Sequence, residues 1–119
     1  MAFNNSSQTG ETETPVPSLA RTTTGNTAAL GNYGPARTLR AQLNVTAASG
    51  TTPNLAALIE DSLDNGITWN TIGTFTARTT TGREVINITT PFATLLRASW
   101  VITGTTPSFT FAIDWYAKP

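Results

Sequence analysis

The 119-residue chain contains no cysteine and no histidine, and only 12% of its residues are charged. Without cysteine there is no disulfide framework, no thiolate nucleophile and no cysteine-based zinc site. Without histidine the chain lacks the commonest general base and the commonest transition-metal ligand. Seven basic residues balance seven acidic ones, so the clustered positive charge typical of nucleic-acid or anionic-membrane binding is missing. We therefore expect no metal, no other cofactor, no nucleic-acid partner and no membrane partner.

Long apolar runs and the features of a secretory signal are also missing. No window approaches the 18 apolar residues that a transmembrane helix needs. Residues 1–10 contain neither a basic region nor an apolar region, so they do not resemble a signal peptide. The expectation is a protein that is made and assembled in the cytosol.

Threonine is the residue that the chain has in excess, with 25 copies. Its β-branched side chain suits a pleated, partly solvated surface, and its hydroxyl keeps such a surface soluble. The length matches one compact domain of about 100–150 residues. We predict an all-β protein built as a single antiparallel β-sandwich.

Alternation of apolar and polar residues predicts about seven strands, spaced as in a sandwich or barrel. The signal is clearest over residues 38–47, where every second residue is apolar. Residues 54–63 are apolar on both faces, which predicts a central strand, with a short helix as the alternative. The expected strands cover residues 27–33, 38–47, 54–63, 67–75, 84–89, 95–103 and 108–117.

Residues 1–24 differ in composition from the rest and predict an extended N-terminal arm, with the β-sandwich domain spanning residues 25–119. The arm is polar and contains Pro15 and Pro17, which favour an extended path over a helix. One interpretation is a disordered tail. The other is an arm that becomes ordered on a neighbouring subunit, with Phe3, Val16 and Leu19 as its anchors.

Two short phrases occur twice, in the same order. The sequence Arg-Thr-Thr-Thr-Gly occupies residues 21–25 and 78–82, and Gly-Thr-Thr-Pro occupies residues 50–53 and 104–107. We interpret them as turns that join antiparallel strands, because glycine supplies a free φ and proline begins a strand where no amide donor is needed. Two such units would form comparable halves of a sandwich. So few residues match that a shared turn chemistry is favoured over a true duplication.

One local motif has a known shape. Residues 62–69 read Ser-Leu-Asp-Asn-Gly-Ile-Thr-Trp, which resembles the Asp-box, the hairpin signature of sialidase-type propeller blades. An aspartate can accept backbone amides across a tight turn, a glycine can adopt positive φ, and a tryptophan can pack the turn on a core. The box is structural in the families that it resembles. We therefore interpret Ser62, Asp64, Gly66 and Trp69 as a structural hairpin lock.

Acidic residues around this motif raise two functional alternatives. A calcium loop could use Glu60, Asp61, Asp64 and Asn65, although these lack the alternating ligand spacing of an EF-hand. A glycosidase needs only two carboxylates, and the candidates are Glu60, Asp61, Asp64, Glu84 and Asp114. The carboxylates are few, several fall at expected solvent-facing positions, and no nucleophile-elbow or phosphate-binding motif occurs. We expect no enzyme.

Four elements together resemble a known group of proteins. They are the Gly-Thr-Thr-Pro turn at 50–53, the hairpin at 62–69, Leu-Arg-Ala-Ser-Trp at 96–100, and Gly-Thr-Thr-Pro-Ser-Phe-Thr-Phe at 104–111. With them, about three quarters of the chain, from about Thr27 to Lys118, resembles small virion proteins of tailed bacteriophages. The resemblance implies a jelly-roll or immunoglobulin-like sandwich in the virion, made in the host cytoplasm. The hairpin reads Asp-Asn-Gly instead of Asp-Gly, so we expect a turn one residue longer.

Among virion components, a capsid decoration (cement) protein is the function we expect. Such a protein is small, neutral and β-rich, and it stabilises the shell by binding the major capsid protein through many shallow contacts. A homo-oligomer, expected here as a homotrimer, raises the effective concentration of each contact. Trp115 and Tyr116 are adjacent in a strand, so one of them should face outward as a candidate contact.

Two alternatives remain. The first is a tail, neck or other minor virion component, which would differ mainly in symmetry. The second is a glycan-binding module for host adhesion, because exposed tryptophan or tyrosine on a flat β face can stack on sugars. For the second, the discriminating feature is whether two of Trp69, Trp100 and Trp115 lie exposed on one surface.

Overall fold

The computed structural model describes residues 12–31, 33 and 36–118, and all regular structure in this part of the chain is β. The strands are β1 (Thr12–Arg21), β2 (Gly25–Asn26), β3 (Thr38–Ser62), β4 (Asn70–Thr74), β5 (Gly82–Ile88) and β6 (Leu95–Lys118). Every pairing between them is antiparallel, and together they form one sheet. This confirms the all-β prediction. No helix long and apolar enough to cross a membrane is found in the described residues.

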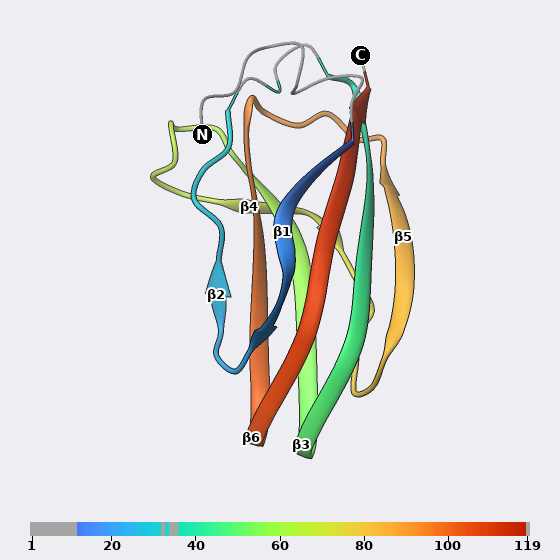
Figure 1. Ribbon diagram of the computed structural model, residues 1–119. Coiled ribbons are helices and arrows are strands. Elements are labelled where there is room, and N and C mark those ends of the chain that lie inside the picture. Colours follow the sequence, from blue (N-terminus) through green and yellow to red (C-terminus); the bar gives the residue numbers. More distant parts are fainter. Residues whose placement is uncertain (1–11, 32, 34–35, 119) are drawn as a thin grey trace.

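Strands β3 and β6 organise the molecule. They are 25 and 24 residues long, and they pair from Thr38 opposite Lys118 to Ser62 opposite Leu95. Figure 1 shows both strands folding back at the same end of the molecule. The fold-back lies at the two Gly-Thr-Thr-Pro phrases, where the register shifts and where Gly50 and Gly104 have φ of 117° and 120°.

The two phrases are therefore bends inside continuous strands, whereas the sequence analysis placed turns there. The four predicted strands over residues 38–47, 54–63, 95–103 and 108–117 are the four halves of β3 and β6. Thr51 remains paired with Thr105 at the bend. The same residue types serve a turn and a bend, because both need positive φ from glycine.

Divided at the bends, the sheet has eight strand segments, which pair in two groups of four that we call layer 1 and layer 2. Layer 1 contains β1, the second half of β6, the first half of β3, and β5. Layer 2 contains β4, the second half of β3, the first half of β6, and β2. Numbered along the chain, the segments are β1, β2, the two halves of β3, β4, β5 and the two halves of β6. In these numbers, the strand orders of the layers are 1-8-3-6 and 5-4-7-2. This is the order of an eight-stranded jelly roll, and it is consistent with the predicted β-sandwich.

Most of the core is made by the inward-facing residues of β3 and β6. Leu39, Leu43, Phe109 and Phe111 are almost fully buried, as the period-two pattern predicted. The ring of Trp100, from layer 2, meets the ring of Phe111, from layer 1, edge to face with centroids 5.6 Å apart. This contact joins the two layers through an aromatic pair of favourable geometry.

Residues 12–21 of the predicted arm form β1, a strand of the domain's own sheet. Val16 is 1% exposed, and it pairs with Ile113 on β6. The guanidinium of Arg21 lies 4.8 Å from the centroid of the Phe111 ring. The interpretation of this segment as an arm on a neighbouring subunit, separated from the domain at residue 24, therefore differs from the structure. Its prolines fit because β1 is an edge strand, where a missing amide donor is tolerated.

The repeated phrases mark an internal twofold relation between residues 12–62 and residues 70–118. Four strand partnerships each have a counterpart: Glu13–Trp115 with Asn70–Asp61, Val16–Ile113 with Gly73–Ile59, Arg21–Phe109 with Arg78–Leu55, and Gly25–Trp100 with Gly82–Val45. The Thr51–Thr105 pair lies at the centre of this relation. The phrases thus hold equivalent places in two equivalent halves, beyond the shared turn chemistry that the sequence analysis favoured.

The two halves are interlocked. Strands β1, β2 and β3 belong to the first half, and β4, β5 and β6 belong to the second half. Each pairing between named strands joins a strand of one half to a strand of the other. Neither half therefore contains a strand ladder of its own among the described residues.

Alanine at Gly50 or Gly104 is expected to destabilise the fold by similar amounts. A Cβ at Gly50 would lie 2.8 Å from the Pro107 Cα, and one at Gly104 would lie 2.8 Å from the Thr52 carbonyl oxygen. Alanine is also strained at the positive φ of these two positions. Each change should therefore lower the free energy of unfolding, measured by chemical denaturation, by about 1–3 kcal/mol. Gly31→Ala is the control, because its Cβ would meet only Leu95 at 3.6 Å. Equal stability of all three variants would contradict the role of the bends.

Candidate functional site

The loop of residues 62–69 connects β3 to β4 and is closed by its own side chains. Asp64 accepts hydrogen bonds from the Thr68 backbone N at 2.8 Å and from the Thr68 Oγ1 at 2.6 Å. The Ser62 hydroxyl donates to Asp64 Oδ1 at 2.9 Å and accepts from the Gly66 N at 2.7 Å. Asn65 and Gly66 both have positive φ, 61° and 90°. These are the contacts that the hairpin-lock interpretation requires.

Trp69 completes the loop on its β6 side. The Arg97 guanidinium lies 4.5 Å from the centroid of the Trp69 ring, and its Nε lies 2.7 Å from Glu60 Oε1. The ring is therefore held by a cation–π contact whose cation is itself fixed by an ion pair. The Trp69 side chain is thus half-buried, whereas the sequence predicted that it packs the turn on the core.

The loop presents apolar side chains on this rigid frame. Leu63 and Ile67 are each 80% exposed, the largest exposures among the large apolar residues described. Internal hydrogen bonds hold the backbone that carries them. A preorganised loop loses little conformational entropy when it binds, so exposed apolar groups on it can act as anchors.

The Asp64 contacts are expected to weaken on acidification. Hydrogen bonds from the side chain and backbone of Thr68 hold the pKa of Asp64 below its usual value. Because the folded-state pKa lies below the unfolded one, the contribution is complete at neutral pH and is lost as pH falls through the folded-state value. The melting-temperature difference between the natural chain and Asp64→Asn should therefore shrink as the pH falls through and below the ordinary aspartate range. A difference that is constant with pH would contradict this assignment.

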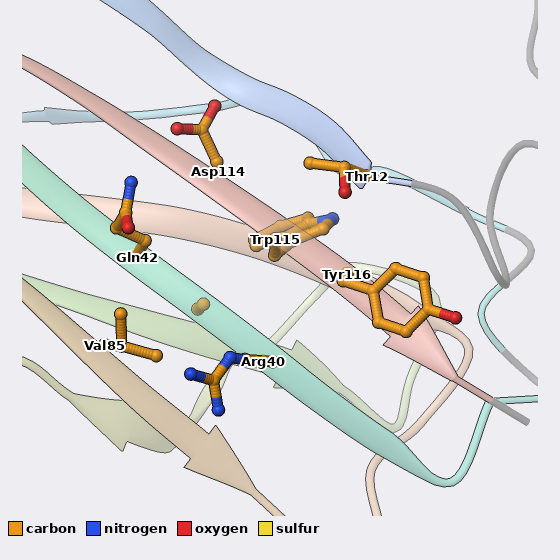
Figure 2. A pocket seen from close by; sticks show the side chains of 8 residues that line it. Thr12, Arg40, Gln42, Val85, Asp114, Trp115 and Tyr116 are labelled. Carbon is orange, nitrogen blue, oxygen red and sulfur yellow. The ribbon is translucent and has the colours of Figure 1, made fainter.

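A hollow of about 300 Å³ lies on the outer face of layer 1 (Figure 2). Its lining residues are Thr12, Arg40, Ala41, Gln42, Val85, Asp114, Trp115 and Tyr116. They come from β1, β3, β5 and β6, the four strands of the layer. The alternation that buries Leu39 and Leu43 turns Arg40 and Gln42 outward. In register, Arg40 lies opposite Tyr116 and Gln42 lies opposite Asp114.

Two neighbours position the charged groups of the hollow. The Thr14 hydroxyl donates to Asp114 Oδ1 at 2.7 Å. The Arg40 Nη1 donates to Asn87 Oδ1 at 3.1 Å. One cation and one anion thus face the same space, each held by a polar side chain from the adjacent strand.

The five candidate partner-binding residues differ in their exposure to solvent. Tyr116 lines the hollow, half-buried, and Leu19 is 60% exposed on β1. Val16 and Trp115 are each 1% exposed, so they pack in the core and present almost no surface to a partner. The inference that one of Trp115 and Tyr116 faces outward thus holds, with Tyr116 as the outward one. Phe3 lies outside the described residues.

A buried polar cluster that the sequence analysis missed anchors β1. The Tyr33 hydroxyl donates to Glu13 Oε1 at 2.6 Å, and the Trp115 indole Nε1 donates to the Tyr33 oxygen at 3.1 Å. Burial, together with the Glu13 carboxylate, raises the pKa of Tyr33. The cluster spans 102 positions of sequence between Glu13 and Trp115, and no local pattern signals such a contact.

The candidate catalytic and calcium-binding carboxylates are engaged with separate neighbours. Glu60 pairs with Arg97, and Asp61 accepts the Ala93 N at 2.8 Å. Glu84 accepts the Thr76 N at 2.8 Å, while Asp64 and Asp114 bond to threonines, as described above. Within the described part of the chain, no three acidic side chains gather as a metal site. Each carboxylate thus has a local structural partner.

No protein-family model and no curated protein matches the chain. Evidence on its function therefore comes from the chain's own surfaces. On those surfaces, the exposed tryptophan pair that would favour a glycan-binding module is not formed, because Trp100 and Trp115 are 8% and 1% exposed.

Proposed function

We propose that the chain is a structural virion protein that binds the outer surface of a phage capsid as a decoration protein and stabilises the shell. The observation that carries the proposal is the rigid 62–69 loop, with Leu63 and Ile67 each 80% exposed. Large apolar side chains held out from a small domain favour a protein partner, because burying them on association is favourable.

The sequence elements that resemble phage virion proteins support this proposal. The two Gly-Thr-Thr-Pro phrases occupy the bends, residues 62–69 form the hairpin loop, and residues 96–100 lie in a central segment of layer 2. The resembling elements thus form the bends, a connecting loop and a central strand of the jelly-roll order, which is found in viral capsid and lectin domains. This similarity of fold supports a structural role, and the capsid-binding site is argued from the 62–69 loop instead.

An oligomer on the shell would use the same loop several times. We propose a homotrimer that contacts the major capsid protein, because linked copies raise the effective concentration of each weak contact. A trimeric mass in analytical ultracentrifugation is the expected result for the free protein.

The test is co-sedimentation with undecorated shells of the phage that encodes the chain. The natural protein should bind and raise the temperature at which the shells open. The double variant Leu63→Ser with Ile67→Ser should bind at least about tenfold more weakly, a loss of about 1.4 kcal/mol, while melting as the natural protein does. Val101→Ser, which changes an apolar residue that is 43% exposed on layer 2, is the matched control. Failure of the natural protein to bind shells would refute the proposal.

A further inference from the structure

The hollow on layer 1 has hydrogen-bonding capacity that the described protein groups do not use. The Gln42 amide and the Tyr116 hydroxyl have no hydrogen-bond partner among the described residues, and Asp114 uses only Oδ1. Arg40 uses only Nη1, toward Asn87. Donors and acceptors are therefore available within one space, beside the ring of Tyr116. Figure 2 shows these side chains surrounding the hollow, with Val85 on its β5 side.

We propose that this hollow binds a neutral saccharide. Sugars present adjacent hydroxyl groups, which pair with planar groups such as the Asp114 carboxylate, the Gln42 amide and the Arg40 guanidinium. The C–H face of a sugar ring is apolar and packs on an aromatic ring, here that of Tyr116. The hollow, about 300 Å³ in volume, is at the lower end of the size range of small-ligand sites.

Charge balance favours a neutral ligand over an ionic one. Arg40 and Asp114 contribute opposite charges to the same lining. A phosphate or carboxylate group would be drawn to Arg40 but repelled by Asp114, and a cation would meet the reverse arrangement. Hydroxyl groups can donate to the carboxylate and accept from the guanidinium, so a sugar uses both.

The site is held in shape before any ligand arrives. Asp114 is fixed by Thr14 at 2.7 Å, and Arg40 is fixed by Asn87 at 3.1 Å. The backbones below these residues are paired strands of layer 1. Side chains that are already ordered lose less entropy on binding, which helps a shallow site bind at all.

The experiment is a titration of the isotope-labelled full chain, followed by backbone and side-chain NMR shifts. The probes are D-glucose, D-galactose, D-mannose, L-rhamnose, N-acetyl-D-glucosamine, maltotriose and chitotriose, each at up to roughly 50 mM, which saturates a site with a Kd of about 1 mM. At least one probe should give saturable shifts confined to Arg40, Gln42, Val85, Asp114, Tyr116 and their neighbours. No saturable shift at these residues with any of the probes would overturn the proposal.

Three variants distinguish stacking from indirect effects. Tyr116→Ala should weaken binding at least about tenfold, and Tyr116→Phe should stay within about threefold of the natural chain because it keeps the ring. If Tyr116→Ala melts early, Gln42→Leu supplies the second test and should also bind about tenfold more weakly. Binding unchanged in a folded Tyr116→Ala or Gln42→Leu variant would overturn the assignment. Since none of these residues belongs to the 62–69 loop, shell binding is scored independently of sugar binding.

Discussion

Two fragments of the chain, residues 1–65 and 66–119, are expected to be unfolded when separate and to fold together when mixed. The reason is the interlocking of the halves, because each pairing between named strands joins one half to the other. A single half would leave its strands unpaired and its apolar faces in water, which a chain of this length does not tolerate. The cut lies in the 62–69 loop, so it removes loop contacts and no strand pairing.

Tryptophan fluorescence gives this experiment a signal from one fragment only. All three tryptophans lie in residues 66–119, and Trp100 and Trp115 are buried only in the assembled fold. Adding the first fragment should shift the emission of the second to shorter wavelength, with an end point at equimolar ratio and a β-type circular dichroism spectrum. A cooperative melting transition in either fragment alone would contradict the interlocked arrangement.

Removal of residues 1–20 is expected to unfold the domain, whereas removal of residues 1–11 should leave it folded. The longer deletion removes nearly all of β1, including Val16, whose burial contributes about 1.5–3 kcal/mol. It also removes Glu13, the partner of Tyr33, and leaves an open edge along the second half of β6. These losses together approach the whole stability of a small domain, about 5–15 kcal/mol.

Thermal unfolding by circular dichroism checks both deletions. The chain that begins at Thr12 should melt within a few degrees of the natural protein, and the chain that begins at Arg21 should show no cooperative transition. Glu13→Ala in the full-length chain is the matched point change, and it should lower stability by about 1–3 kcal/mol because the buried Tyr33 hydroxyl loses its acceptor. A folded, cooperative chain beginning at Arg21 would restore the interpretation of residues 1–24 as an arm separate from the folded domain.

Strand positions and faces could be predicted where a long alternating pattern exists. Residues 38–47 and 108–117 alternate cleanly, and their inward residues are the buried ones. Strand β1 could not be predicted, because its ten residues bury a single apolar side chain, Val16, and include two prolines. Its stability comes from contacts with β6, 88 to 104 positions away, which local composition does not reveal.

The site could be predicted only in part. Adjacent Trp115 and Tyr116 must face opposite sides of a strand, so an outward aromatic was inferable. That Arg40 lies opposite Tyr116 depends on the register between β3 and β6, which alternation alone leaves open. The contacts of the 62–69 loop could be predicted because they are local: Ser62, Asp64 and Thr68 are close in sequence.

The interlocked halves also determine when the protein can fold during its synthesis. Strand β6 is the partner of β1, β2 and β3, and it follows all three in the chain. While the ribosome still holds β6 in its exit tunnel, the three strands of the first half have already emerged without their main partner. Non-local pairing of this kind makes folding slow and leaves unpaired edges open to other nascent chains. The sheet therefore cannot be completed until β6 has left the exit tunnel, and the hydroxyl groups of the many threonines help to keep the strands that emerge first hydrated until then.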